Sequence, residues 1–187
     1  MKTLLKSLSL LSCIAMVVSC DLVWGPVDPP DTPSRPLDEP VAFNADFTTT
    51  FSKSMIPEGH IDLKGSVYQM VQTGSGSDDE LGGFQINLKC YWSATDCIPG
   101  RSGGSLTDGM GNVLFIRCKE CFSQGDLTAE FPLNQTHITG RFEFAGGTGR
   151  FANATGEGTI DCMVAADGQV ASMSHHWTGF IKNVKLY

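Results

Sequence analysis

Residues 84–92 read Phe84-Gln-Ile86-Asn-Leu88-Lys-Cys90-Tyr-Trp92, and apolar and polar side chains alternate along this stretch almost one by one. Successive side chains of a β-strand point to opposite faces, so a period of two gives one apolar and one polar face. A helical pattern would repeat every 3.6 residues instead. The stretch therefore predicts a strand that is buried on one side and exposed to solvent on the other.

The same period of two recurs from residue 41 to the end of the chain. Further strand candidates are residues 43–51, 61–67, 113–118, 127–133, 136–144, 156–164 and 171–185. Glycine-rich turns separate them, at residues 74–83, 100–111, 146–149 and 167–168. About eight short strands with such turns predict an all-β fold, a single closed antiparallel barrel over residues 41–187.

The first 19 residues carry Lys2 and Lys6 and then an apolar run over residues 8–18. This is the order of a secretory signal peptide, and the run is shorter than the about 20 residues of a membrane-spanning helix. It ends in Val17-Val18-Ser19-Cys20, which resembles the lipobox of bacterial lipoproteins. The resemblance implies that residues 1–19 are removed, that Cys20 is lipidated, and that the protein is anchored in the bacterial cell envelope. The alternative is an ordinary signal peptide that is cut elsewhere.

Residues 20–40 link this anchor to the barrel and contain six of the nine prolines. Such a segment cannot bury a core and favours an extended conformation, so we expect a disordered tether. Without residues 1–19 the chain keeps 11 basic and 20 acidic residues. This acidic balance argues against nucleic acid or anionic lipid headgroups as partners.

The most distinctive stretch is Phe144-Ala-Gly146-Gly147-Thr148-Gly149-Arg-Phe151-Ala-Asn-Ala154-Thr-Gly156-Glu-Gly158-Thr. It resembles a hairpin of the allene oxide cyclase and dirigent-like β-barrels, and residues 90 and 108–112 resemble small secreted bacterial members of that group. The role of Gly146, Gly147, Thr148 and Gly149 is structural, because glycine supplies the positive φ of a tight turn. The resemblance implies an eight-stranded barrel with an apolar interior for a small molecule.

Five cysteines follow Cys20, namely Cys90, Cys97, Cys118, Cys121 and Cys162. Disulfides are the default in an exported chain. Cys90 with Cys118 and Cys97 with Cys121 are the pairs suggested by neighbouring strand candidates, which leaves Cys162 free and buried. A zinc site of the first four cysteines is the rival hypothesis, since Cys118-x2-Cys121 is a familiar zinc-binding pair. We expect disulfides, and no metal or other cofactor.

Strand-borne aromatic residues are the candidates for lining a ligand pocket: Tyr68, Trp92, Trp177 and Phe180. His175 and His176 are adjacent in a strand and therefore point to opposite faces, and ordinary strand or surface positions are expected for them. No catalytic cluster is recognisable.

These observations predict a non-catalytic, lipid-anchored binding protein for a small apolar or amphipathic ligand. One alternative is a cyclase or isomerase of the allene oxide cyclase or dirigent type, which requires an inward-facing polar group such as Arg141, Glu143 or Cys162. Another is a structural envelope lipoprotein that binds protein or glycan through its loops.

Overall fold

The structure is a computed structural model that describes residues 36–56, 67–93, 95–125, 127, 136–167 and 170–186. The signal peptide, Cys20 and the tether up to residue 35 lie outside the described residues, as do the expected strand at residues 61–66 and residues 128–133. Within the described ranges, no helix has the length and hydrophobicity that a membrane span requires.

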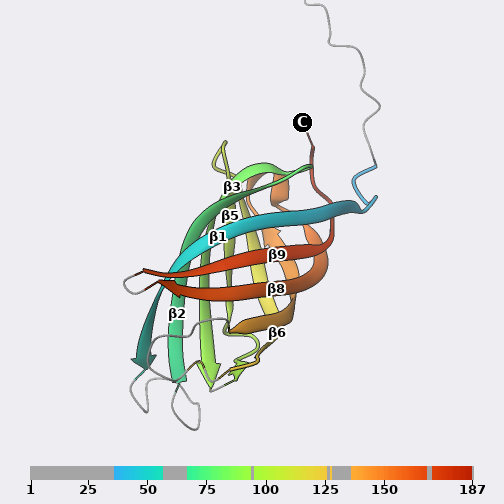
Figure 1. The fold of residues 1–187 in the computed structure, drawn as a ribbon. Coiled ribbons are helices and arrows are strands. Elements are labelled where there is room, and N and C mark those ends of the chain that lie inside the picture. Colours follow the sequence, from blue (N-terminus) through green and yellow to red (C-terminus); the bar gives the residue numbers. More distant parts are fainter. Residues whose placement is uncertain are drawn as a thin grey trace, which may run out of the picture. The chain divides into compact units, whose positions relative to one another are not determined.

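Nine strands and one short 3-10 helix make up the described fold (Figure 1). The strands are β1 (Val41–Ile56), β2 (Val67–Asp78), β3 (Gly82–Ser93), β4 (Asp96–Cys97), β5 (Gly103–Asp108), β6 (Val113–Ser123), β7 (His137–Gly147), β8 (Thr155–Asp167) and β9 (Val170–Lys182). The 3-10 helix η1 (Gly149–Phe151) lies between β7 and β8.

Strand pairing closes the sheet into a barrel. Each long strand pairs antiparallel with its neighbours in the circuit β1-β2-β3-β5-β6-β7-β8-β9, and β9 returns to β1. The two-residue β4 pairs with both β3 and β6 beyond the end of β5. β4 and β5 therefore occupy the same position in the barrel, between β3 and β6, one after the other along its length. The expected all-β barrel of about eight strands is confirmed.

Two strands lie where the sequence suggested turns. β2 continues through Gly74 and Gly76, and β5 begins at Gly103, although both regions are rich in glycine. At Gly74 and Gly104 an added Cβ would lie 2.2 and 2.0 Å from a carbonyl oxygen of the neighbouring strand. These glycines therefore permit close approach of neighbouring strands within the sheet, which is a different role from a turn.

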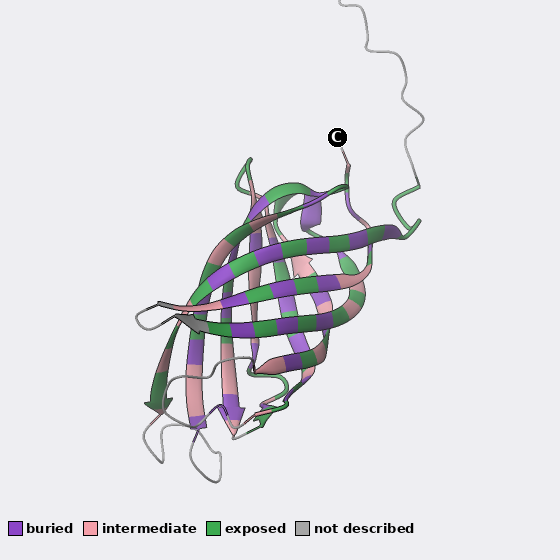
Figure 2. Cartoon of the chain, viewed as in Figure 1, coloured by how far each residue is buried: buried purple, intermediate pink, exposed green. Residues whose placement is uncertain are grey.

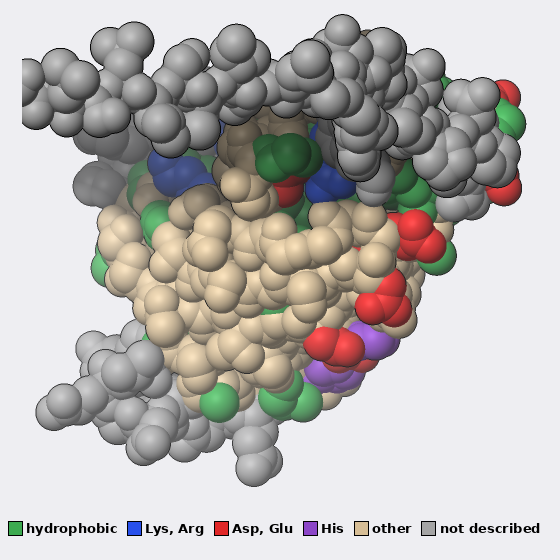
Figure 3. Space-filling model, turned by 90° about the horizontal axis from the view of Figure 1, so that it is seen from above, with side chains coloured by type: hydrophobic (Ala, Val, Ile, Leu, Met, Phe, Trp, Pro, Cys, Tyr) green, Lys and Arg blue, Asp and Glu red, His purple; other side chains and the backbone are tan. Residues whose placement is uncertain are grey.

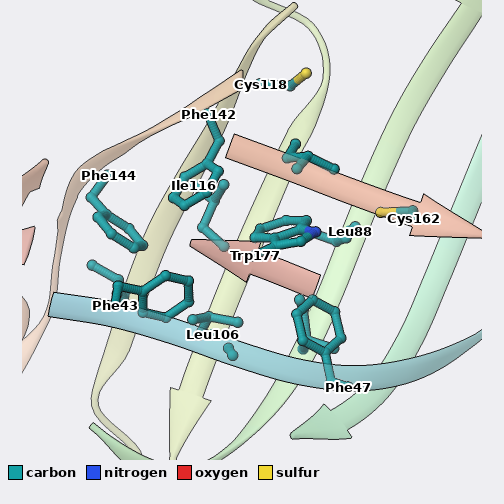
Figure 4. Packing of buried hydrophobic residues seen from close by; sticks show 14 of the residues in the cluster. Phe43, Phe47, Leu88, Leu106, Ile116, Cys118, Phe142, Phe144, Cys162 and Trp177 are labelled. Atoms are coloured by element: carbon teal, nitrogen blue, oxygen red, sulfur yellow. The ribbon is translucent and has the colours of Figure 1, made fainter. Parts of the chain in front are cut away.

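The interior follows from the period of two. Buried and exposed residues alternate along β1, β8 and β9, as the banding in Figure 2 shows. Inward rings pack edge to face around the middle of the barrel: Phe43 lies 5.9 Å from Phe142 and 5.2 Å from Phe144, and Phe142 stacks on Trp177 at 4.9 Å (Figure 4). The barrel is thus filled largely by its own aromatic side chains.

The glycine-rich hairpin closes one end of the barrel. Gly146 and Gly149 have φ values of 79° and 55°, which favour glycine. Thr148 fixes the turn to β6, because its N–H donates to Val113 O over 2.7 Å and its Oγ1 accepts from Val113 N–H over 3.0 Å. These contacts place Gly149 and η1 directly over the β5–β6 turn.

Candidate functional site

The barrel interior contains a small chamber of about 30 Å³. Its wall includes Cys118, Cys121 and Ile116 from β6, Trp92 from β3 and Trp177 from β9. A volume of this size holds a water molecule or a single ion. It is far below the several hundred Å³ of a site for a ring-sized organic ligand. The apolar interior pocket that the family resemblance implied is therefore not open in this structure.

A belt of inward-facing polar groups crosses five neighbouring strands beside this chamber. Cys162 Sγ lies 3.0 Å from His175 Nδ1, and His175 Nε2 lies 2.9 Å from Thr49 Oγ1. Thr49 Oγ1 donates to Gln72 Oε1 over 3.0 Å, and Gln72 Nε2 lies 4.0 Å from Cys90 Sγ. We call Cys162, His175, Thr49, Gln72 and Cys90 the polar belt.

The belt fixes the tautomer of His175. The single hydroxyl proton of Thr49 is given to Gln72, so His175 Nε2 must carry the proton that it donates to Thr49. His175 Nδ1 is then the acceptor, and the Cys162 thiol donates to it. Within the polar belt, the side chains of Cys162, His175 and Thr49 are thus hydrogen-bonded to neutral neighbours.

Burial keeps the belt uncharged. Desolvation lowers the pKa of His175 to about 3 and raises the pKa of Cys162 and of Cys90 to about 12. At neutral pH none of the three carries a charge. The Cys162–His175 pair is thus a hydrogen-bonded pair of neutral groups and not a thiolate–imidazolium pair of the kind that activates a nucleophile.

His175 and His176 were expected on opposite faces without a choice between them, and His175 is the one that faces the interior. Its ring stacks on Phe47 at 4.4 Å with the planes 10° apart, and only 4% of the residue is exposed. The signal was available in the alternation of β9, where His175 falls in phase with buried Met173 and Trp177. His176 points outward as expected and pairs with Asp46 at 2.7 Å. Figure 3 shows histidine and acidic side chains side by side on one flank.

The three polar groups considered for catalysis lie on different faces of the barrel wall. Arg141 is exposed, and Glu143 pairs on the outside with Arg117 at 2.8 Å and with Lys119 at 3.0 Å. Hydrogen bonds from Lys119 and Arg117 lower the pKa of Glu143. Of the three groups considered for catalysis, only Cys162 faces the interior.

Of the four aromatic residues expected to line a ligand pocket, two line the chamber and two do not. Trp92 and Trp177 line the chamber, and each is at most 3% exposed. Trp92 Nε1 has no hydrogen-bond partner within the described part of the chain, whereas Trp177 Nε1 is directed at the Cys162 thiol without a well-aligned hydrogen bond. Tyr68 lies beside Lys53, whose Nζ is 4.5 Å from the ring centroid. Phe180 is on the outer face beside Lys182.

Three cysteines meet beside the chamber, and two of them, Cys118 and Cys121, line it. Cys97 Sγ lies 3.2 Å from Cys118 Sγ, and Cys118 Sγ lies 2.7 Å from Cys121 Sγ. The expected pairs Cys90–Cys118 and Cys97–Cys121 are not formed, because the described cysteines are all free thiols. Cys118 contacts Cys97 and Cys121 instead of Cys90. We call Cys97, Cys118 and Cys121 the thiol cluster.

A larger concave site lies on the outside of the barrel. It is a groove of about 460 Å³ over β3, β5 and β6. Its floor is the backbone of Gly103 and Gly104, and its sides carry Lys89, Arg101 and Arg117. The exposed ring of Phe115 also lines it.

The strand register explains this groove. Lys89 is directly opposite Gly103, and Gly103 is directly opposite Arg117. Two cationic side chains therefore flank a position with no side chain. Arg101 lies two residues before β5. The next residue, Ser102, is fixed to β3, because its Oγ accepts a hydrogen bond from Tyr91 N–H over 3.0 Å.

Comparison with known proteins adds a distant fold likeness. No protein-family model matches the sequence, and no curated protein matches it. Among solved structures, the pterocarpan synthase dirigent protein GePTS1 aligns with a TM-score of 0.42 and 12% identity, over 84% of this chain and 98% of that one. A likeness at this level has no bearing on ligand or activity, and the barrel assignment stands on the strand pairings described above.

Proposed function

We propose that this protein is a lipid-anchored envelope protein whose β-barrel domain binds a small amphipathic anion in the outer groove. The observation that carries the proposal is the row Lys89–Gly103–Arg117 across three paired strands. It places the cationic side chain of Lys89 and the Glu143-paired guanidinium of Arg117 on the two sides of a bare backbone floor, in a groove of about 460 Å³. Sites for small organic molecules have volumes of about 300–1,000 Å³.

The charges of the groove favour an anion. Lys89 and Arg101 have no acidic partner among the described residues, whereas Arg117 is paired with Glu143. The whole chain has a net charge of −7, so this is a local concentration of positive charge on an acidic protein. An anionic group between Lys89 and Arg101 gains charge-assisted hydrogen bonds.

The remaining surface of the groove favours a flat apolar body on the same ligand. Phe115 is 45% exposed and offers a ring face or edge, and the glycine floor has no side chains that exclude a planar group. The ligand class supported by this lining is a ring-bearing carboxylate or phosphate. This retains the amphipathic ligand expected from the sequence, with its site outside the barrel.

The cyclase or isomerase alternative receives no support from the site. A chamber of about 30 Å³ cannot admit a ring-sized substrate, and the polar belt is neutral and internally satisfied. We therefore do not propose it.

Binding is tested by calorimetry of the full-length chain with benzoate, with glucuronate and with neutral benzamide. We expect benzoate to bind, glucuronate to bind more weakly and benzamide not to bind, and added salt to weaken the binding. Lys89→Ala and Arg101→Ala should each lower affinity about tenfold, which is what loss of a charged hydrogen bond costs. Benzoate and glucuronate arms distinguish an aromatic acid from an acidic sugar.

Lys119→Ala is the matched control, because Lys119 is an outward cation on β6 that does not line the groove. The Lys119→Ala variant should bind benzoate as tightly as the parent protein does. Equal binding of benzamide, or unchanged binding by the Lys89→Ala/Arg101→Ala double variant, would overturn the proposed site.

The anchor is tested separately. The support for it is the stretch Val17-Val18-Ser19-Cys20 at the end of the apolar run. Cys20→Ala should move the protein from the membrane fraction to the soluble fraction of cells and should abolish labelling by a fatty acid. Unchanged membrane association and labelling would contradict lipidation at Cys20.

A further inference from the structure

We propose that the thiol cluster binds one thiophilic d10 metal ion, Cu(I) or Zn(II), inside the barrel. This site is independent of the outer groove. It uses Cys97 from β4 and Cys118 and Cys121 from β6, whose sulfur atoms all lie within 4.8 Å of one another. All three residues are buried.

A β-bulge creates the site. Residues three apart in a regular strand point to opposite faces, so Cys118 and Cys121 should not both face inward. The β6–β7 register shifts between Cys118 and Glu120, which places Lys119 and Glu120 outside and returns Cys121 to the interior. Bulges of this kind re-aim side chains and are common next to functional sites.

The neighbouring strand leaves space for the cluster. Gly140 of β7 is directly opposite Cys121, and an added Cβ at Gly140 would meet the Glu120 carbonyl oxygen first and would lie 2.9 Å from Cys121 Sγ. Any other residue at this position would push against that sulfur. β4 completes the site, because its pairing with Trp92 and with Phe122 holds Cys97 against β6.

The donor set selects soft ions. Thiolates favour Cu(I) and Zn(II) over magnesium, calcium or manganese. Zn–S bonds of about 2.3 Å place the sulfurs of a tetrahedral site about 3.8 Å apart. The shortest separation here is 2.7 Å, so the cluster opens by about 1 Å when an ion enters.

Binding of the ion forms three metal–sulfur bonds and releases the three thiol protons of Cys97, Cys118 and Cys121 to solvent, with no transfer of electrons.

The test loads the full-length chain with Co(II) as a spectroscopic probe for zinc, and in a second arm with Cu(I) held by a chromogenic chelator. We expect one equivalent of metal in at least one arm, with a sulfur-to-cobalt charge-transfer band if the site takes zinc. Cys97→Ser, Cys118→Ser and Cys121→Ser should each weaken binding by about 100-fold or more, beyond the effect of losing a supporting group.

Cys90→Ser is the matched control, since Cys90 lines the same chamber and belongs to the polar belt but not to the cluster. Its metal affinity should be unchanged. Gly140→Ala keeps every ligand and should weaken binding about 10- to 100-fold by displacing Cys121. If the serine variants fail to fold, protection of the three cysteines from alkylation by metal in the parent protein replaces them.

Three results would overturn the proposal. The first is failure of both ions to bind. The second is binding that persists when all three cysteines are replaced by serine. The third is a disulfide within the cluster in protein purified with its thiols blocked, because oxidation would remove two of the three ligands.

Discussion

Arg150 and Asp108 form a buried ion pair where three turns of the barrel meet. Arg150 Nε donates to Asp108 Oδ2 over 2.8 Å, and the two side chains are 7% and 6% exposed. Arg150 Nη2 also donates to Leu81 O over 2.6 Å, which ties η1 to the β2–β3 turn. Burial opposes the charge of Asp108, but hydrogen bonds from Asn112, Met110 and Arg150 lower its pKa.

Arg150→Met should destabilise the barrel by about 3–5 kcal/mol, because it leaves a buried carboxylate without its charged partner. The measurement is urea unfolding followed by tryptophan fluorescence. Arg141→Met is the control, since Arg141 makes only exposed ion pairs with Glu120 and Glu157 and should cost at most about 1 kcal/mol. Equal losses in the two variants would contradict the role of the buried pair.

Gly149→Ala should destabilise the protein through two effects. Gly149 has φ 55°, and an added Cβ would lie 1.8 Å from Asn112 Oδ1. Gly82→Ala separates the effects, because Gly82 has φ 75° but nothing within 4 Å of its added Cβ. We expect about 1–2 kcal/mol for Gly82→Ala and a larger loss for Gly149→Ala, measured by thermal unfolding. If Gly149→Ala lost no more stability than Gly82→Ala, the side chain of Asn112 would have to move away from the added Cβ at no cost.

His175 should make stability depend on pH. Its pKa is 6.5 when unfolded and about 3 when folded, so between these values the unfolded chain binds the extra proton. Stability is therefore fully present above pH 6.5 and falls as the pH drops toward 3, by up to about 1.4 kcal/mol per pH unit. Comparison of parent and His175→Gln by urea unfolding at several pH values between 7 and 4 should show a shallower slope in the variant. Identical slopes would count against a buried neutral imidazole.

Phe142→Ala should cost about 3–5 kcal/mol, since Phe142 is fully buried and packs against Phe43, Phe144 and Trp177. Phe122→Ala on the outer face of β6 is the control, because Phe122 is 51% exposed and should change stability by about 0.5 kcal/mol or less. Thermal unfolding of both variants measures the difference. A small loss at Phe142 would mean that the interior rearranges easily enough to accept a guest.

The period of two in the sequence predicted most of the long strands, the all-β class and the inward face of most residues on those strands. It works because a strand that is buried on one face has to alternate, as residues 84–92 do. The same rule was sufficient to place His175 inside, although only ordinary strand or surface positions were expected for the two histidines. Glycine misled the prediction at β2 and β5, because a glycine that permits close strand approach and one that makes a turn look alike in sequence.

Only the tertiary structure decided the sites. The thiol cluster depends on a bulge that breaks the alternation between Cys118 and Cys121, and no period in the sequence marks it. The outer groove depends on the register that sets Lys89, Gly103 and Arg117 in one row, although the first and the last are 28 positions apart in the sequence. Alternation fixes the face of each residue, but register and bulges fix its neighbours, and these arise from closure of the whole barrel.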